Sequence, residues 1–394
     1  MDTTRLSAWI ADRATVSDDG DGLVDSLCRA LVEAGLPLWR FSVSAPTIDP
    51  LHRGVSLNWY ADRDFDFELN PHGTEQEAVW LRSPIHALLH RGEHAGRWRL
   101  EAADAGDAFP ILRELRAQGG TDYVLRVVAF APGTALRGAA LSFTTRRPDG
   151  FAEAEIAALD ALLPVLGLAM SKLILAHTLR DVLGTYLGPA TADRVLDGDI
   201  QRGQGRMVPA AILLADLRAF TALSDRADPL AVAGWLNEHF DALGEPVARH
   251  GGEILKFLGD GFLATFPVPD AAAPSCAGCG AALSAAAEAL TANAALNARR
   301  RAAGAPELTA DLVLHYGEVV QGNVGTDRRL DFTLIGRAMN EASRIEGHCE
   351  RLGRALLISD VFAARCGGAL EPVGSVTLRG LASPQRVWTL PGLG

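Results

Sequence analysis

Two aspartates of the sequence stand where an apolar, strand-like segment gives way to a turn. Asp216 follows the apolar run 208–215, and Asp260 lies at the tip of the segment FLGDG. Two carboxylates brought together at the ends of neighbouring strands repel each other, and a hard divalent cation such as Mg²⁺ relieves that repulsion because it prefers oxygen ligands. Each aspartate alone also has an ordinary interpretation, as a helix cap for Asp216 and as an Asp-Gly turn residue for Asp260. Together they predict a candidate metal site.

Asn340 and Arg344 have the types and spacing to contact a ribose and a phosphate. They are four residues apart within the helix-patterned segment GRAMNEASRIEGH, so both side chains project from one helical face. Lys256 precedes Asp260 by four residues in an extended segment, which separates their Cα atoms by about 13 Å. That distance is long for two groups that act on one substrate. Taken singly, Lys256, Asn340 and Arg344 are also ordinary surface residues.

Alternating strand and helix signals over 207–394 supply the elements that must position these residues. Asp228 followed by Pro229 predicts a helix start, and Gly259-Asp260-Gly261 predicts a hairpin between strands 253–258 and 262–266. The remaining expected elements are a strand at 208–215, an Ala-rich helix at about 276–303, a strand pair across 312–324, a strand at 331–335 and a helix at 336–352. This order predicts a βαββαβ sheet with helices on one face.

The motifs ILLADLRAFTALSD, GGEILKFLGDGFLATF, HYGEVVQGNVG and LDFTLIGRAMNEASRIE occur in that order. Together they resemble the catalytic domain of class III adenylate and guanylate cyclases over 207–394, which implies a ferredoxin-like βαββαβ fold. The resemblance implies two ions of Mg²⁺ or Mn²⁺ per active site. It assigns Asp216, Leu217 and Asp260 to these metals.

The same resemblance implies how the nucleotide is held. Lys256 and Thr333 would read the base, and Asn340 would hold the ribose. Arg344 would stabilise the phosphate under attack. The further substrate-binding positions are Phe220, Thr221 and Arg328, and Arg328 and Arg329 also have an ordinary interpretation as solvated turn residues.

A head-to-tail homodimer is a further implication of the resemblance. The metal aspartates would come from one protomer, and Lys256, Thr333, Asn340 and Arg344 would come from the other. The separation of about 13 Å between Lys256 and Asp260 fits this division, because the two residues of one chain would then serve different sites. The reaction would be an in-line attack of the ribose 3′-hydroxyl on the α-phosphorus that expels pyrophosphate.

Thr333 departs from a common pattern of this family, in which an aspartate stands seven residues before the asparagine. Asp331 lies two residues earlier and shares the strand face with Thr333, so it is the second choice as a base reader. A threonine at this position resembles a Lys/Thr subgroup of these cyclases that is often stimulated by bicarbonate. Bicarbonate is therefore a candidate effector.

The hydrogen-bond types favour ATP as substrate. Adenine presents an acceptor at N1, and the Lys256 ammonium can only donate. Guanine presents a proton at N1, a mismatch that costs about 1 to 3 kcal/mol for an unpaired buried donor. Cytosine presents the same acceptor and donor pair as adenine. The alternatives are therefore a guanylate or pyrimidine nucleotide cyclase, or a catalytically silent dimer that senses nucleotide or ligand.

The segment 1–176 predicts an α+β domain with the order helix, strands, helix, strands and a long helix, which resembles a GAF-like sensor domain. An unknown small-molecule effector is expected there. Aromatic residues of this segment could line a pocket, although strand aromatics are more often core residues: Trp39, Trp59, Tyr60, Trp80 and Trp98. The segment 177–206 predicts a helical linker with an apolar stripe that pairs with its own copy in a dimer or docks on its own domain.

Composition narrows the classes of function. The sequence has 37 Lys and Arg against 48 Asp and Glu, a net charge of −11, which disfavours a nucleic-acid partner. Its five cysteines predict reduced thiols in a cytoplasmic protein, with Cys276 and Cys279 on a helix surface rather than in a redox or metal site. The sequence starts without the pattern of an export signal. The apolar stretch 156–176 holds Asp160, Pro164 and Lys172, so a buried helix is expected in place of a membrane span.

Overall fold

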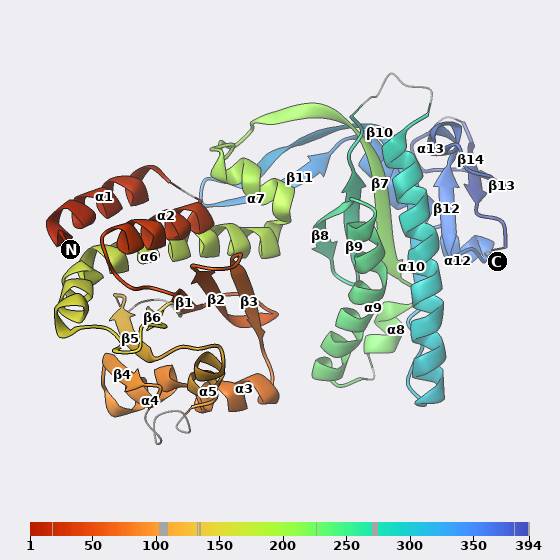
Figure 1. The fold of residues 1–394 in the computed structure, drawn as a ribbon. Helices are drawn as coiled ribbons and strands as arrows, with labels where there is room; N and C mark the ends of the chain where they lie inside the picture. Colours follow the sequence, from red (N-terminus) through yellow and green to blue (C-terminus); the bar gives the residue numbers. More distant parts are fainter. Residues whose placement is uncertain are drawn as a thin grey trace. The chain divides into compact units, whose positions relative to one another are not determined.

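The structure, a computed structural model, describes residues 1–17, 19–101, 109–131, 133, 135–225, 227–269, 275–381 and 383–392. The chain divides into two compact units, Met1–Thr185 and Tyr186–Gly394, and each is described by itself (Figure 1). Both units mix helices with a largely antiparallel sheet.

The first unit is built on a six-stranded antiparallel sheet of order β3-β2-β1-β6-β5-β4. Its strands are β1 (Arg40–Pro46), β2 (His52–Tyr60), β3 (Asp66–Pro71), β4 (Ala95–Arg99), β5 (Asp122–Ala129) and β6 (Gly138–Thr145). Its helices are α1 (Thr3–Val16), α2 (Gly20–Glu33), α3 (Thr74–Leu81), α4 (Pro84–Arg91), α5 (Pro110–Ala117) and α6 (Glu153–Leu187). The mixed α+β class expected from the sequence is confirmed for this unit.

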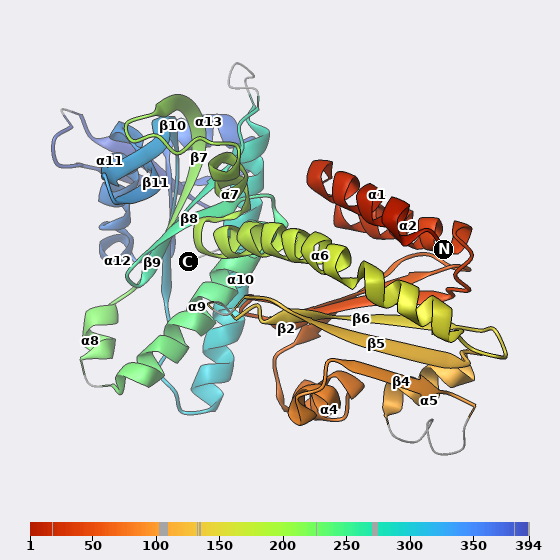
Figure 2. The same ribbon diagram turned by 90° about the vertical axis from the view of Figure 1, so that its left-hand side faces the viewer.

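The two faces of this sheet differ in character. Phe41 and Val43 of β1 and Phe143 of β6 belong to a large apolar core together with residues of α1, α2 and α6. Side chains alternate between the two faces along a strand. Arg40 and Ser42, which alternate with Phe41 and Val43 in β1, therefore point to the opposite face. Figure 2 shows α1, α2 and α6 on one side of the sheet and α4 and α5 on the other.

Among the described residues, α6 is the one helix long and apolar enough to cross a membrane by length and composition, with a mean hydropathy of 1.8. Its first half packs in the core of the first unit, where Leu159 and Leu166 are fully buried. The charged residues that interrupt it are also used inside this unit. Asp160 pairs with Arg126 at 2.6 Å, and Lys172 Nζ donates to the carbonyl of Ser17 at 2.7 Å. The first half of α6 therefore belongs to the core of the first unit.

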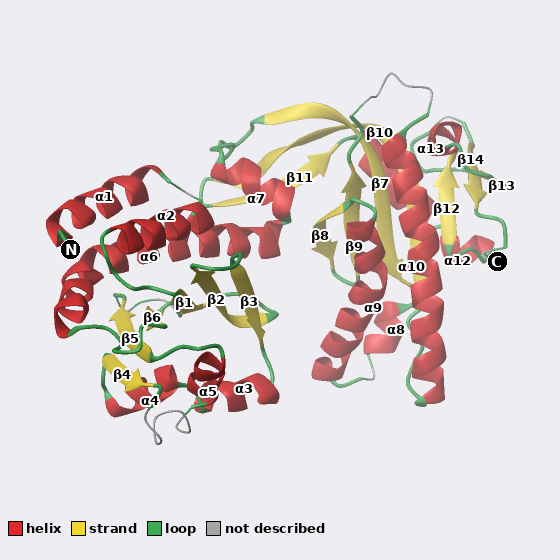
Figure 3. Ribbon diagram, in the orientation of Figure 1, coloured by secondary structure: helices red, strands yellow, loops and turns green. Residues whose placement is uncertain are grey.

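The second unit is built on an eight-stranded sheet whose main path is β13-β14-β12-β10-β7-β9-β8, with β11 paired to β10. Its strands are β7 (Gly205–Leu217), β8 (Glu253–Leu258), β9 (Gly261–Phe266), β10 (Ala310–Thr326), β11 (Arg329–Ile335), β12 (Leu356–Ser359), β13 (Glu371–Val376) and β14 (Gln385–Thr389). Its helices are α7 (Pro189–Leu196), α8 (Phe220–Ser224), α9 (Pro229–Arg249), α10 (Ala277–Ala302), α11 (Arg337–Glu346), α12 (Cys349–Leu352) and α13 (Asp360–Cys366) (Figure 3). The expected βαββαβ order is confirmed in β7-α9-β8-β9-α10-β10.

Two details of this unit differ from the sequence prediction. The expected strand pair across 312–324 is one continuous strand, β10, which pairs with β7 from Ala310 to Gly322. The sheet also carries helices on both faces: one core joins alternate residues of β7 to α9, α10 and α13, and a second core joins the intervening residues to α11 and α12 (Figure 2). Burial on both faces explains why β7 reads as a continuous apolar run.

Local signals fixed several boundaries of the second unit. The Asp228 carboxylate accepts from the Leu230 amide at 2.9 Å, and Pro229 occupies the first turn of α9. Cys276 caps α10, and its sulfur accepts from the Cys279 amide at 3.2 Å. Both cysteines are buried, so the expected place on a helix surface is wrong. The cause is that the N-terminal half of α10 packs into the core that β7, β9 and α13 also form.

Candidate active site

The structure brings Asp216 and Asp260 together. Asp216 lies near the end of β7, and Asp260 lies in the turn between β8 and β9. Strand β9 pairs with β7, and Phe262 of β9 lies opposite Ala215 of β7. A side chain at Gly261 would place its Cβ 2.2 Å from the Ala215 carbonyl oxygen and 2.9 Å from an Asp216 carboxylate oxygen. Glycine is therefore required at this position, because the turn lies directly against Asp216.

Negative charge is concentrated around Asp216. The pKa of Asp216 is raised to about 7, first by burial and then by the neighbouring carboxylates of Asp260, Glu346 and Asp311, in that order. The pKa of Glu346 is also raised, first by burial and then by Asp311 and Asp260. A set of carboxylates with raised pKa is a site where a cation binds favourably.

Asp311 is a carboxylate that the sequence interpretation missed. It is 3% exposed and lies opposite Asp216 in the register of β10 and β7. The Arg218 guanidinium holds it through two hydrogen bonds, of which the bond from Nε measures 3.0 Å. Arg218 therefore compensates Asp311 and leaves the charge of Asp216 and Asp260 for another partner. Glu346 was missed as well, because only the packing of α11 brings it near the pair.

The donor set of the aspartate pair fits Mg²⁺ or Mn²⁺. Within the part of the chain that the structure describes, three or more His, Cys, Asp or Glu residues do not gather in a group that could hold a metal ion. Mg²⁺ commonly binds through one or two carboxylates and completes its shell with water and substrate phosphates. Leu217 has a buried side chain packed with Leu296 and Leu308, so its contribution would be its main-chain carbonyl oxygen.

Lys256 and Thr333 lie on the neighbouring strands β8 and β11, which are in contact. The Lys256 ammonium forms an ion pair with Asp331 at 3.2 Å. Thr333 is 7% exposed, and its hydroxyl oxygen has no hydrogen-bond partner among the residues that the structure describes. A buried hydroxyl without such a partner is unusual, because buried polar groups are normally paired. The Thr333 hydroxyl therefore keeps an unused capacity for a hydrogen bond.

Asn340 and Arg344 project from α11 into one hollow, which is also lined by Arg337, Gly380 and Leu381. The opposite face of α11 is buried through Ala338, Ala342 and Ile345, which fixes the exposed face toward this hollow. The helical spacing predicted from the sequence is confirmed.

The remaining predicted positions lie around these groups. Phe220 begins α8 and packs half-buried against the cluster that contains Leu217, whereas Thr221 is exposed. Arg328 is exposed in the turn between β10 and β11. In the described part of a single chain, no hydrogen bond or ion pair joins Asp216 or Asp260 to the groups on β8, β11 and α11. The division of the site between two protomers stays a prediction.

Comparisons with known proteins agree with the geometry of the second unit. Residues 204–388 match the sequence profile of the adenylate and guanylate cyclase catalytic domain. "Adenylate cyclase 1" of Rhizobium meliloti is 32% identical over 187 residues, which cover 46% of this chain and 27% of that protein. The adenylate cyclase of Anabaena cylindrica is 32% identical over 166 residues, which cover 41% of this chain and 32% of that protein. This chain therefore spans less than a third of the length of either relative in these matches.

One solved structure is similar over most of the chain. A bacterial light-regulated adenylyl cyclase aligns with 90% of this chain and 93% of its own length, with a TM-score of 0.50 and 15% sequence identity. At this identity the similarity concerns the fold alone.

Proposed function

We propose that this chain, whose residues 204–388 match the adenylate and guanylate cyclase catalytic domain, is a class III cyclase that converts ATP to 3′,5′-cyclic AMP and pyrophosphate. The observation that carries the proposal is the Asp216 and Asp260 pair, held together by Gly261 and surrounded by further carboxylates. A fold that only bound a ligand would have little use for this uncompensated charge. The similarity to two adenylate cyclases supports the same activity.

Asp216 and Asp260, with the Leu217 carbonyl oxygen, would hold two Mg²⁺ or Mn²⁺ ions, which when bound lower the pKa of the ribose 3′-hydroxyl and neutralise the triphosphate. The raised pKa of Asp216 supports this assignment, because a bound cation would favour its ionised form. Phe220 and Thr221 follow directly after the metal-binding strand β7, and Arg328 lies in a neighbouring turn. We assign these three residues to the triphosphate.

Arg344 would stabilise the charge that develops on the α-phosphate, and Asn340 would hold the ribose. Both side chains lie on the exposed face of α11 and line one hollow. A guanidinium suits this role because it stays charged and presents a planar fork to phosphate oxygens. Arg344 forms no ion pair with a carboxylate of the described residues.

Lys256 and Thr333 would read the adenine edge. The ammonium of Lys256 donates to N1, and the unpartnered Thr333 hydroxyl accepts from the N6 amino group. Asp331 would orient Lys256 through their ion pair of 3.2 Å. A guanine base would present a proton to the ammonium, so GTP is disfavoured.

The active enzyme would be a head-to-tail homodimer. Large apolar side chains are exposed on the strands that carry Lys256 and Thr333, which supports a second copy as their cover: Phe257 (56%), Leu258 (45%), Leu330 (39%) and Ile335 (45%). The first unit would be a GAF-like sensor that regulates turnover in response to a small molecule. Its central six-stranded sheet with a helical bundle on one face supports this role.

The direct test is turnover of ATP, GTP, CTP and UTP by the purified full chain with Mn²⁺ or Mg²⁺, with cyclic nucleotide and pyrophosphate both quantified. Cyclic AMP and pyrophosphate in equal amounts are expected, with ATP preferred. Absence of any cyclic product under either metal would refute the catalytic proposal.

Complementation tests the shared site. Asp216→Ala and Arg344→Ala chains, each inactive alone, should regain about a quarter of wild-type turnover when mixed, because half of the dimers are mixed and each mixed dimer has one intact site. Mixing Asp216→Ala with Asp260→Ala is the matched control and should recover nothing, since both aspartates belong to one protomer. Equal recovery in both mixtures would contradict the head-to-tail arrangement.

A further inference from the structure

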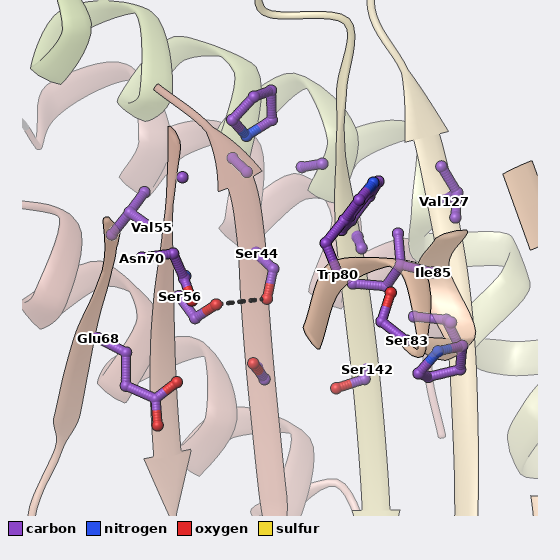
Figure 4. Close-up of a pocket in the computed structure, with 18 of the residues that line it drawn as sticks. Ser44, Val55, Ser56, Glu68, Asn70, Trp80, Ser83, Ile85, Val127 and Ser142 are labelled. Carbon is purple, nitrogen blue, oxygen red and sulfur yellow. Dashed lines mark hydrogen bonds between the residues drawn. The ribbon is translucent and has the colours of Figure 1, made fainter. Parts of the chain in front are cut away.

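A cavity of about 500 Å³ lies in the first unit, between the sheet and the segment that contains α3 and α4. Its floor is the sheet face opposite the large apolar core. Three neighbouring strands contribute serine side chains to this floor, Ser44 from β1, Ser56 from β2 and Ser142 from β6 (Figure 4). Ser44 and Ser56 are bonded to each other at 2.8 Å. A buried sheet face normally carries apolar residues, so a polar floor requires another explanation.

The floor also contains a buried cation. Arg40 is 6% exposed and lines the cavity. Its guanidinium donates to Asn58 Oδ1, to the Tyr60 hydroxyl at 3.2 Å and to Ser142 Oγ at 3.4 Å. All three partners are neutral, and Arg40 forms no ion pair with a carboxylate of the described residues. A buried charge without a counter-ion is unfavourable, because burial removes its hydration.

The charged residues that line the cavity are mainly cationic. Arg53 and Arg137 line it in addition to Arg40, whereas Glu68 is its one carboxylate among the described lining residues. The pKa of Glu68 is raised, first by burial and then by Asp66, although the charge of Arg40 acts to lower it. The chain as a whole carries a net charge of −11, so a cavity with three arginines is a local exception.

The remaining walls are apolar. Trp80, Ile85 and Val127 surround the side of the cavity away from Glu68 (Figure 4). Arg53 lies over the Trp80 ring, with 5.5 Å between the guanidinium carbon and the ring centroid. Apolar walls with a few polar groups at one end are typical of small-molecule sites, and cavities of about 300 to 1,000 Å³ hold drug-sized ligands.

We propose that this cavity binds a small organic anion with a planar apolar body, whose anionic group pairs with Arg40 while its ring packs between Trp80 and Ile85. The serine and asparagine side chains of the floor would complete the hydrogen bonds of the anionic group. The ligand class is thus an aromatic carboxylate or phosphate. This inference does not depend on the function proposed for residues 204–388, because binding to the first unit can be measured without turnover.

The test is calorimetric titration of the full chain with two probe pairs. Indole-3-carboxylate is compared with indole-3-carboxamide, and phenyl phosphate with phenol, because each pair shares a ring and differs in charge. We expect the anion of at least one pair to bind, and the pair that binds identifies the anionic group. The matched neutral probe should bind at least about tenfold more weakly, since a charge-assisted hydrogen bond is lost. No binding by either anion, or equal binding within each pair, would overturn the proposal.

Two variants locate the binding site. Arg40→Gln should weaken the anion at least about tenfold and bring it to the level of its neutral partner. Arg116→Gln is the matched control, because it removes the same charge from an exposed position on α5. If Arg40→Gln does not fold, Ser44→Leu decides, since it narrows the cavity and keeps Arg40. Unchanged anion binding in Ser44→Leu or in folded Arg40→Gln would place the anion elsewhere and refute the assignment.

Discussion

Replacing Asp216 by Asn should stabilise the metal-free protein, by an amount that grows as the pH rises above about 4 and levels off above about 7. The pKa of the Asp216 carboxyl is raised from 3.8 to about 7, chiefly by burial and then by Asp260. A carboxyl whose pKa is raised on folding contributes stability below its unfolded pKa and loses it as the pH rises through the folded value. The metal-free wild type therefore loses stability between about pH 4 and pH 7.

The magnitude follows from the shift. A change from 3.8 to about 7 corresponds to about 4 kcal/mol at 1.36 kcal/mol per unit. Asp216 is only half-buried, and solvent screening reduces such values, so a gain of about 2 kcal/mol is expected for Asp216→Asn at pH 8. At pH 4 the gain should be close to zero. Added Mg²⁺ should stabilise the wild type at pH 8 and leave the variant unchanged.

Hydrogen exchange of β7 and β9 peptides in the presence of a chelator measures this difference within the second unit alone. Wild type and variant are compared at the same pH, so their intrinsic exchange rates cancel. Asp241→Asn, at an exposed carboxylate of α9, is the control and should change little at either pH. A variant that is no more stable than wild type at pH 8, or equally stabilised at pH 4, would refute the electrostatic interpretation of the pair.

Three further outcomes are expected. Arg344→Ala should lower kcat about 100- to 1,000-fold with a smaller change in KM for ATP, because its guanidinium is assigned to charge that develops during the reaction. A comparable rise in KM with an unchanged kcat would contradict that role. Thr333→Val should narrow the preference for ATP over GTP in a competition assay by about tenfold, because it removes the hydroxyl assigned to N6, and an unchanged ratio would exclude Thr333 as a base reader. His239 is fully buried without a hydrogen-bond partner among the described residues, and burial lowers its pKa from 6.5 to about 4. The wild type should therefore lose up to about 3 kcal/mol of stability as the pH falls from 6.5 toward 4, and urea unfolding should find this loss reduced in His239→Leu.

The parts of the second unit that the sequence predicted correctly are those set by local chemistry. The turn at Gly259, Asp260 and Gly261 needs a left-handed glycine, and Gly259 has a φ of 72°. The start of α9 needs a capping carboxylate and a proline, and both are present at Asp228 and Pro229. Such signals depend on a few adjacent residues, so they can be recognised without knowledge of the tertiary structure.

The single strand β10 was missed because its cause is distant in the sequence. Gly317 suggests a turn between two strands, yet it is paired with Ala210 inside the β7 and β10 ladder. A Cβ at Gly317 would lie 2.7 Å from the Cβ of Ala338 on α11. The glycine thus allows a helix to approach the sheet closely, which is a second common reason for glycine in a strand.

The same contrast applies to the candidate active site. Strand ends and helical spacing were enough to single out Asp216, Asp260, Asn340 and Arg344. Asp311 and Glu346 escaped notice because a register and a helix packing that no local pattern encodes bring them near Asp216. Their charges also contribute to the electrostatics, since both raise the pKa of Asp216, after burial and Asp260.

In the first unit, the informative signal was the set of polar residues that alternate with apolar ones along β1. The sequence interpretation weighed aromatic residues and favoured core positions, and Trp39, Trp59 and Tyr60 are indeed buried, whereas Trp80 lines the cavity. Strand β1 alternates Arg40, Ser42 and Ser44 with apolar residues, a pattern that normally indicates a solvent-exposed face. Here that face is covered by α3 and α4, so its polar groups enclose a cavity. Alternation in a strand therefore identifies which residues share a face, and only the tertiary structure determines whether water or a ligand meets them.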